Sequence, residues 1–245
     1  MVSLIFDTDI WISFIAKDKP SGILDEIQQK VNNSEIVLLT NDVIIDEWKR
    51  NKEQTLKAAE NIIQGTFKSA KKSFEYYSEE KQEKFDELIS DFFESKEELI
   101  ENAKLQVERT DELLLSCEKT PISDEMKLQI IDWALEKRAP FHSKNNSVGD
   151  ALILLSSVNY LKEQTIGITD SIFVSFNHTD FSKKENKDEI HEDLAALLDE
   201  ANVKFTRHIG EALELAPEMN KEIAEYLDYM IDDWIQTQID IQRGK

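Results

Sequence analysis

Two short apolar runs near the start of the chain each end at an acidic residue or just before one. The first, Val2–Phe6, stops at Asp7, and the second, Ile36–Thr40, stops before Asp42. Uninterrupted β-branched runs of this length are typical of strands covered on both faces, as in parallel sheets. Between them, segment 22–31 has apolar residues at helical spacing. The order strand, helix, strand predicts a βαβ unit.

The middle of the chain, residues 52–137, has a different pattern. Lys and Glu recur at helical spacing, apolar residues follow every three or four positions, and no strand pattern is present. We expect two or three long helices there, inserted into the domain as an antiparallel hairpin. A charged, solvated arm with no chemistry of its own is the simpler interpretation of this insertion.

The pattern returns to α/β after residue 138. It predicts a helix over 147–163, a strand over 172–176, a helix over 193–200 and a last strand over 203–205. These elements and the βαβ unit predict a three-layer α/β/α fold with a mainly parallel central sheet. The domain is expected to span 1–216, with the helical insertion at about 52–137.

A separate C-terminal amphipathic helix is predicted over residues 217–245. Ile223, Leu227, Met230 and Trp234 form its apolar stripe. The stripe is expected to dock on the domain, with a homodimer seam as the alternative. The sequence also leaves open an inhibitory protein partner.

Composition narrows the class of protein. Six Gly and four Pro disfavour collagenous and low-complexity chains, and the single Cys117 excludes a disulfide framework and a Cys-cluster zinc site. No apolar run approaches the length of about 18 residues that spans a membrane. We therefore expect a cytoplasmic protein without a membrane partner.

The charge balance restricts how the chain can meet nucleic acid. It has 29 Lys and Arg against 50 Asp and Glu, a formal net charge of −21. The field of such a protein repels phosphate, which argues against passive, charge-driven binding. An enzyme that meets phosphate through bound cations remains compatible with it, because a divalent ion inverts the local field.

Acidic and amide side chains follow the predicted strand ends, where the working site of an open α/β sheet lies. Like charges gathered there are costly unless cations neutralise them. Oxygen ligands without Cys or paired His favour Mg²⁺ or Mn²⁺ over zinc. The residues concerned are Asp7, Asp9, Glu47, Asp150, Asn177 and Asp180.

Four segments resemble motifs of PIN-domain nucleases. They read LIFDTDIW, DVIIDEWKR, GDALILL and FVSFNHTDFS, in that order along the chain. The chain most resembles the branch whose last motif is Ser-x-Asn-x-x-Asp-Phe. Two further pieces match it, the lead-in from Arg138 through Pro140 to Lys144 and the stretch from His191 to Leu194. The resemblance covers roughly 1–60 and 138–212.

This resemblance implies a PIN-like fold and metal-dependent hydrolysis of a phosphodiester, with RNA as the usual substrate and DNA not excluded. Asp7 would bind a Mg²⁺ or Mn²⁺ ion directly, and Glu47 and Asp150 would complete the acidic cluster. The ion would orient and acidify a water and stabilise charge at phosphorus. On this basis the chain is expected to be an endoribonuclease.

Asn177 departs from the family pattern, because many members have a fourth acid at its position. An amide there could hold a water or a substrate phosphate, and it puts tight binding of a second ion in doubt. Asp180 follows it as a further catalytic candidate. Lys144, just upstream of the Asp150 helix, is a candidate for pairing with a phosphate.

Several of these acids also have purely structural interpretations. Asp150 fits a capping box that begins at Ser147, although its company with Asp7 favours a functional role. Asp42 is expected to cap a helix rather than bind a metal. Asp46 is expected to face water, and Asp170 to lie in a turn before the strand.

Two other functions compete. A haloacid-dehalogenase-like phosphatase would use Asp7 as nucleophile and Asp9 as general acid, but Trp11 departs from that family's turn. The alternative is a catalytically weak PIN-like module that binds RNA or protein.

A basic strip near the start of the insertion could help an acidic enzyme bind RNA. It consists of Lys49, Arg50, Lys52, Lys68, Lys71 and Lys72.

Overall fold

The apolar runs predicted as strands lie at the centre of a parallel sheet. The computed structural model describes residues 2–16, 22–74, 79–142, 147–164 and 171–215. Five parallel strands follow the order β3-β2-β1-β4-β5. Their bounds are β1 Val2–Phe6, β2 Ile36–Thr40, β3 Glu118–Lys119, β4 Ser171–Val174 and β5 Val203–Thr206. Every residue of β1 is buried, as expected of a strand covered on both faces.

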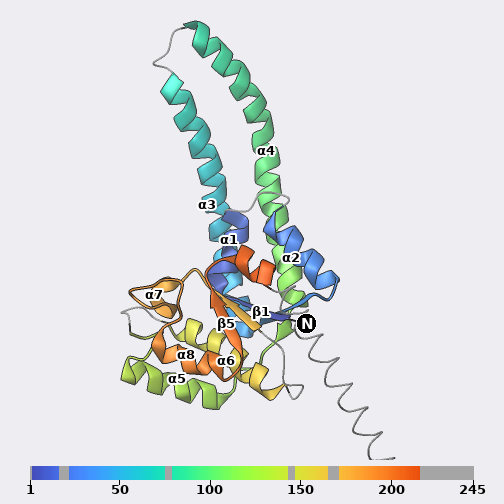
Figure 1. The fold of residues 1–245 in the computed structure, drawn as a ribbon. Coiled ribbons are helices and arrows are strands. Elements are labelled where there is room, and N and C mark those ends of the chain that lie inside the picture. Colours follow the sequence, from blue (N-terminus) through green and yellow to red (C-terminus); the bar gives the residue numbers. More distant parts are fainter. Residues whose placement is uncertain (1, 17–21, 75–78, 143–146, 165–170, 216–245) are drawn as a thin grey trace, which may run out of the picture.

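Helices cover both faces of the sheet, which confirms the expected three-layer α/β/α architecture (Figure 1). In this view α1 and the bases of α3 and α4 lie on one side, and α5, α6 and α8 lie on the other. The labelled helices are α1 Thr8–Ala16, α2 Ile23–Asn32, α3 Asp42–Phe74, α4 Glu79–Ser116, α5 Asp124–Glu136, α6 Val148–Glu163, α7 His178–Phe181 and α8 Glu192–Asp199, and residues 209–215 are also helical.

The helical middle of the chain is built mainly from α3 and α4, which rise together from the domain as a long hairpin (Figure 1). α3 begins at Asp42, ten residues before the expected start of the insertion, and continues unbroken into the arm. The helix that carries Glu47 is therefore also the first helix of the arm.

The expectation that this region contains no strand was wrong. Glu118 and Lys119 form β3, paired with Leu39 and Thr40 of β2. Both β3 residues are exposed, so their side chains carry no strand pattern. Backbone pairing places this short edge strand, and the side chains of Glu118 and Lys119 add surface contacts with Tyr160 and Asp42.

Asp111 of α4 fixes the base of the hairpin. Its Oδ1 accepts a hydrogen bond of 2.6 Å from Trp48 Nε1, and its Oδ2 accepts one of 2.6 Å from Lys52 Nζ. The Trp48 ring is buried, as are those of Trp11 and Trp133. These aromatic residues belong to the core.

The last part of the domain follows the predicted order of helix, strand, helix and strand. β4 ends at Val174 rather than at 176, because Ser175 begins the turn into α7. The predicted amphipathic tail at 217–245 lies outside the described residues. None of the described helices combines the length and the apolar character needed to cross a bilayer.

Candidate active site

Asp7 lies directly after β1, at the carboxyl edge of the sheet. Its carboxylate accepts hydrogen bonds from Thr8 N (2.7 Å) on Oδ1 and from Ser175 Oγ (2.6 Å) on Oδ2. Only 2% of the residue is exposed. Burial raises the pKa of Asp7 to about 6, the two hydrogen bonds oppose this shift, and the charges of Glu47 and Asp180 add to it.

Glu47 reaches the same edge from the second turn of α3. Its Oε2 accepts a hydrogen bond of 2.7 Å from Thr8 Oγ1. On the other side Glu47 Oε1 lies against the backbone of Gly149, where a Cβ would come within 2.5 Å of it. Real Cβ atoms do not approach other atoms this closely. The glycine therefore allows α6 and the Glu47 side chain to come together.

Asp150 lies in the first turn of α6 and faces these carboxylates. Burial, the negative charge of Asp7 and a hydrogen bond with Asp180 together raise the pKa of Asp150 to about 9. The charges of Asp180 and Glu47 raise it further. Asn177 Nδ2 lies 3.4 Å from Asp150 Oδ2 and can donate to it. Burial makes the largest contribution to this raised pKa, and the neighbouring carboxylates add to it.

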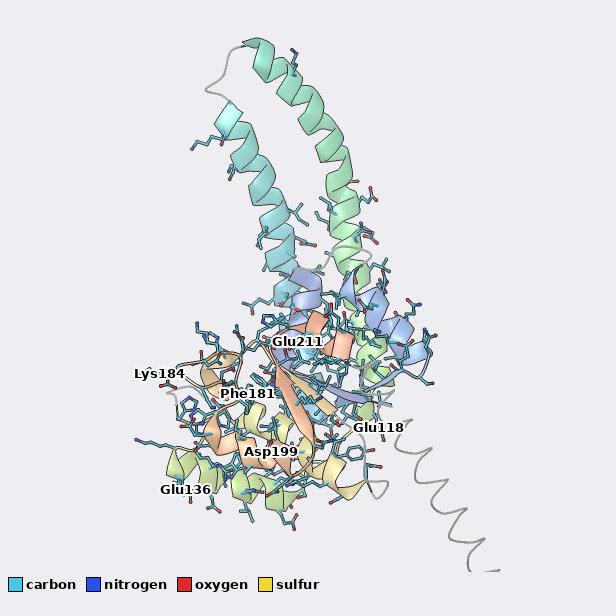
Figure 2. The ribbon with its side chains drawn as sticks, viewed as in Figure 1. Glu118, Glu136, Phe181, Lys184, Asp199 and Glu211 are labelled. Carbon is cyan, nitrogen blue, oxygen red and sulfur yellow. The ribbon has the colours of Figure 1, made fainter. Side chains whose placement is uncertain are left out.

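Asp180 is buried behind this group. Its Oδ2 accepts hydrogen bonds from Ser147 Oγ (2.8 Å) and Asn177 Nδ2 (3.2 Å). The neighbouring Phe181 packs edge-on against Phe173 and lies inside the domain (Figure 2). Ser147 therefore holds Asp180 rather than capping α6, for which its side chain makes no hydrogen bond. The capping-box interpretation of Asp150 is corrected by this arrangement.

An open cleft of about 620 Å³ collects these side chains. It is lined by Asp7, Thr8, Asp9, Ile12, Glu47, Arg50, Asn51, Asp150, Phe176, Asn177, His178 and Thr179. Asp9 reaches the cleft from the first turn of α1, because the chain turns into a helix at Thr8 instead of continuing the strand. The cleft is the place where a phosphate group could meet the carboxylates.

The donor chemistry fits a hard divalent cation. Asp7, Glu47, Asp150 and Asn177 offer carboxylate and amide oxygens, and neither a thiol nor a pair of imidazoles competes with them. The space left by Gly149 brings the Glu47 carboxylate beside the helix of Asp150. Within the described ranges no three His, Cys, Asp or Glu side chains are gathered around one point. The donors are neighbours in the cleft and do not form a finished coordination sphere.

The remaining acids and the lysine considered in the sequence analysis lie outside the cleft or outside the described residues. Asp46 is exposed, as expected. Asp42 does not cap α3, because Asn41 Oδ1 accepts the hydrogen bond from Ile44 N (3.0 Å) and Asp42 pairs with Lys119 at the surface. Lys144 and the predicted turn at Asp170 lie outside the described residues.

The two remaining motif segments meet where α5 ends and α8 begins. Arg138 donates to the carbonyl oxygen of Asp193 through Nε (3.1 Å) and Nη2 (2.6 Å). In return, Asp193 Oδ2 accepts a hydrogen bond from Ala139 N (2.8 Å). His191 caps α8 and stacks near His142, with ring centroids 4.6 Å apart. This clasp anchors the chain that leads toward Asp150, so its role is structural.

Sequence reasoning assigned no role to three residues that shape the site. Thr8 holds Glu47, Ser175 holds Asp7, and Gly149 makes room for Glu47. The signals were visible in the chain. Thr8 stands between two acids and Ser175 opens the Ser-x-Asn motif, but only the fold shows which carboxylate each one touches.

Comparison with known proteins gives one family match. The family model described as PIN domain matches residues 4–181, which is well over half of the chain. The match includes the carboxylates and the amide that line the cleft, together with Asp180 and the arm. Neither a curated protein nor a solved structure gives a match.

Proposed function

The chain belongs to the PIN-domain family, and from this premise we propose that it is a divalent-metal-dependent ribonuclease that cuts RNA internally. PIN domains are typically nucleases, bind nucleic acid and generally use divalent metal ions. The observation that carries the proposal is the cleft in which Asp7, Glu47, Asp150 and Asn177 meet from four separate elements. Mg²⁺ or Mn²⁺ is the ion that such oxygen donors prefer.

Asp7, Glu47 and Asp150 would hold the ion. When bound, a divalent ion supplies charge stabilisation at phosphorus and a more acidic water. Thr8 and Ser175 orient two of these carboxylates through the hydrogen bonds that they donate. A cation in the cleft also favours the charged form of Asp150, whose pKa is raised by burial and its acidic neighbours.

Asn177 and Arg50 are suited to the substrate rather than to the ion. The Asn177 amide lines the cleft and can donate to a phosphate oxygen. Arg50 lines the same cleft, with 68% of its side chain exposed and Nη2 3.9 Å from Glu47 Oε1. Its guanidinium could pair with the phosphate next to the bond that is cut.

The phosphatase alternative is not favoured. Both oxygens of Asp7 already accept short hydrogen bonds, and the side chain is almost fully buried, which suits a positioned ligand better than a covalent nucleophile. The catalytically weak binding module remains the second candidate. Asn177 in place of an acid, and the lack of a preformed three-donor group among the described residues, favour that second candidate.

Cleavage of a fluorogenic RNA with and without Mg²⁺ or Mn²⁺ tests the proposal. Asp150→Asn should lower turnover at least about 100-fold, because losing an ion ligand removes several kcal/mol of transition-state stabilisation. The matched control is Asp46→Asn, which removes an exposed acid next to Glu47 and should leave turnover within about twofold. Ion-induced thermal stabilisation should shrink in the first variant only.

The outcomes separate the candidates. Ion-dependent cleavage that Asp150→Asn abolishes supports the nuclease. A folded Asp150→Asn protein with full activity removes Asp150 from the site. RNA binding without any cleavage by the unmodified chain, with either ion, would instead identify a binding module.

A further inference from the structure

One face of α3 carries a polar stripe that starts in the cleft and runs out along the arm. Its positions follow one another at four- and three-residue steps, so they lie in line on the helix. All seven side chains are exposed. They are Arg50, Gln54, Lys57, Asn61, Gln64, Lys68 and Lys72. We call this set the α3 stripe.

The composition of the α3 stripe is one-sided. It holds four cationic side chains and three side-chain amides, with no acid and no aromatic residue. The acids of α3 end at Glu60. Asp42, Asp46 and Glu47 precede the stripe, and Glu53 and Glu60 lie beside its first half. In contrast, α4 carries thirteen Asp and Glu against five Lys and Arg. In a chain of net charge −21, this stripe is a local exception.

The stripe differs from the basic strip expected from the sequence. Lys52 is half-buried and bound to Asp111, so it braces the arm. Lys49 is exposed but lies off the line of the stripe, and the side chain of Lys71 lies outside what the structure describes. Lys57 belongs to the stripe but not to the basic strip predicted from the sequence. Helical phase, rather than closeness in sequence, selects the members.

The stripe is continuous with the cleft. Glu47, Arg50 and Asn51 line the cleft from α3, and Arg50 is also the first residue of the stripe. Figure 1 shows α3 leaving the domain without a break and extending along the arm. A polymer whose phosphate lies in the cleft could therefore follow the stripe outward.

We propose that the α3 stripe binds the sugar-phosphate backbone of a base-paired RNA segment next to the cleavage site, an inference that rests on the proposed nuclease function. Lys and Arg neutralise phosphates, and the amides can donate to phosphate and ribose oxygens. Unpaired bases are usually held by stacking on aromatic side chains, and the stripe has none. Recognition is therefore of backbone and shape.

The length of the stripe sets the size of the RNA. From residue 50 to residue 72 the helix rises about 33 Å at ~1.5 Å per residue. A DNA duplex rises ~3.4 Å per step, so this length matches roughly ten steps of that form. An A-form RNA stem rises less per step, so at least about ten base pairs are needed to follow the stripe. The substrate class is thus a structured RNA with a stem of at least about ten base pairs beside the scissile bond.

Binding without cleavage tests this inference separately from the enzyme activity. The probes are a fluorescent RNA hairpin with a stem of about ten base pairs, an unpaired RNA of equal length and an RNA of about four nucleotides. Binding is measured by anisotropy without divalent ions, in the Asp150→Asn background. The test variant is Lys57→Gln, Lys68→Gln and Lys72→Gln combined. The control combines Lys127→Gln, Lys187→Gln and Lys204→Gln, three exposed lysines elsewhere.

The test variant should bind the hairpin at least about tenfold more weakly, and its log-log salt dependence should flatten by roughly 0.7–0.9 per lost phosphate contact. The control variant and the short RNA should show little change. Unaltered hairpin binding by the test variant, or an equal loss in the control, overturns the inference. An equal loss on the unpaired RNA overturns the assignment to paired RNA.

Cleavage assays keep the two proposals apart. If the unmodified chain never cuts RNA but the test variant loses hairpin binding, RNA binding by the α3 stripe is supported and the nuclease function is contradicted. If the chain cuts RNA and the test variant binds the hairpin as before, the nuclease function is supported and RNA binding by the α3 stripe is contradicted.

Discussion

Gly149 shows how the absence of one side chain can position a charge. It occupies the first turn of α6, beside Asp150, and its missing Cβ is the space into which Glu47 Oε1 fits. A glycine inside a helix costs about 1 kcal/mol relative to alanine. Here the cost accompanies a close approach of the Glu47 carboxylate to the helix that carries Asp150, so the glycine serves the site and not the helix.

Gly149→Ala should separate stability from activity. The new methyl group meets the flexible end of Glu47, so the backbone need not move and the melting temperature should stay level or rise. Glu47 must turn away, and turnover on RNA should fall at least about tenfold, with weaker ion-induced stabilisation.

The control for Gly149→Ala is Gly210→Ala, because no atom lies within 4 Å of a Cβ at that position. It should change neither turnover nor ion binding. An active Gly149→Ala enzyme with full ion-induced stabilisation would show that the close contact with Glu47 is not needed.

At the scale of single residues, the sequence predicted the acids of the site better than the residues that hold these acids in place. Asp7 and Asp150 could be found because each follows a strand or opens a helix at the edge where such sites lie. The hydrogen bonds from Thr8 and Ser175 could not, because they join residues 39 and 168 positions apart. Asp150 also fitted a capping box, and the hydrogen bond from Ser147 to Asp180 in place of a cap removes that alternative.

Among the elements, α3 depends on a single buried amide at its start. Asn41 Oδ1 accepts from Ile44 N (3.0 Å), and its Nδ2 donates to Ser156 Oγ (2.9 Å) on α6. Asn41 is fully buried. It therefore caps the helix that carries Glu47 and ties that helix to the one that carries Asp150.

Asn41→Ala should lower the free energy of unfolding by about 2–3 kcal/mol. The helix loses its cap, and Ser156 loses a buried partner. Urea denaturation checks the value. Asp42→Ala is the comparison, since its surface pair with Lys119 should contribute no more than about 0.5 kcal/mol. If the two variants are equally stable, Asn41 does not anchor α3.

The pattern of apolar residues predicted most elements but misplaced the start of the arm. The helical period does not change at residue 52, so nothing in the pattern separates the part of α3 inside the domain from the part outside it. The exposed pair Glu118 and Lys119 has no apolar alternation at all. Such an edge strand exists because β2 offers free backbone groups, which is information about the fold and not about the segment.

For the whole molecule, the acidic cluster sets how stability responds to pH. The pKa of Asp7 is raised to about 6 and that of Asp150 to about 9, in both cases chiefly by burial. Between the ordinary carboxyl range and these values, the folded state holds more protons than the unfolded state. Its stability therefore falls as pH rises through this window.

The free energy of unfolding of the ion-free protein should fall as the pH rises from about 5 to about 8. The slope should reach up to ~1.4 kcal/mol per pH unit for each additional proton that the folded state binds relative to the unfolded state. Urea denaturation in a chelator measures this. Asp150→Asn cannot release a proton at that position, so its slope should be shallower, while Asp46→Asn should keep the original slope. A stability that is flat or rises over this range contradicts the assigned shifts.

Because Glu47 and the outer lysines belong to one continuous helix, any tilt of the arm about its base would act as a lever with its fulcrum next to the cleft. Glu47 lies about 7.5 Å from the start of α3 and Lys72 about 45 Å from it, at ~1.5 Å rise per residue. A tilt of about 5° at the base would swing the outer lysine by about 4 Å but shift Glu47 by less than ~1 Å. Such a tilt would let the far end of the arm follow substrates of differing shape while the carboxylate near the pivot barely moves.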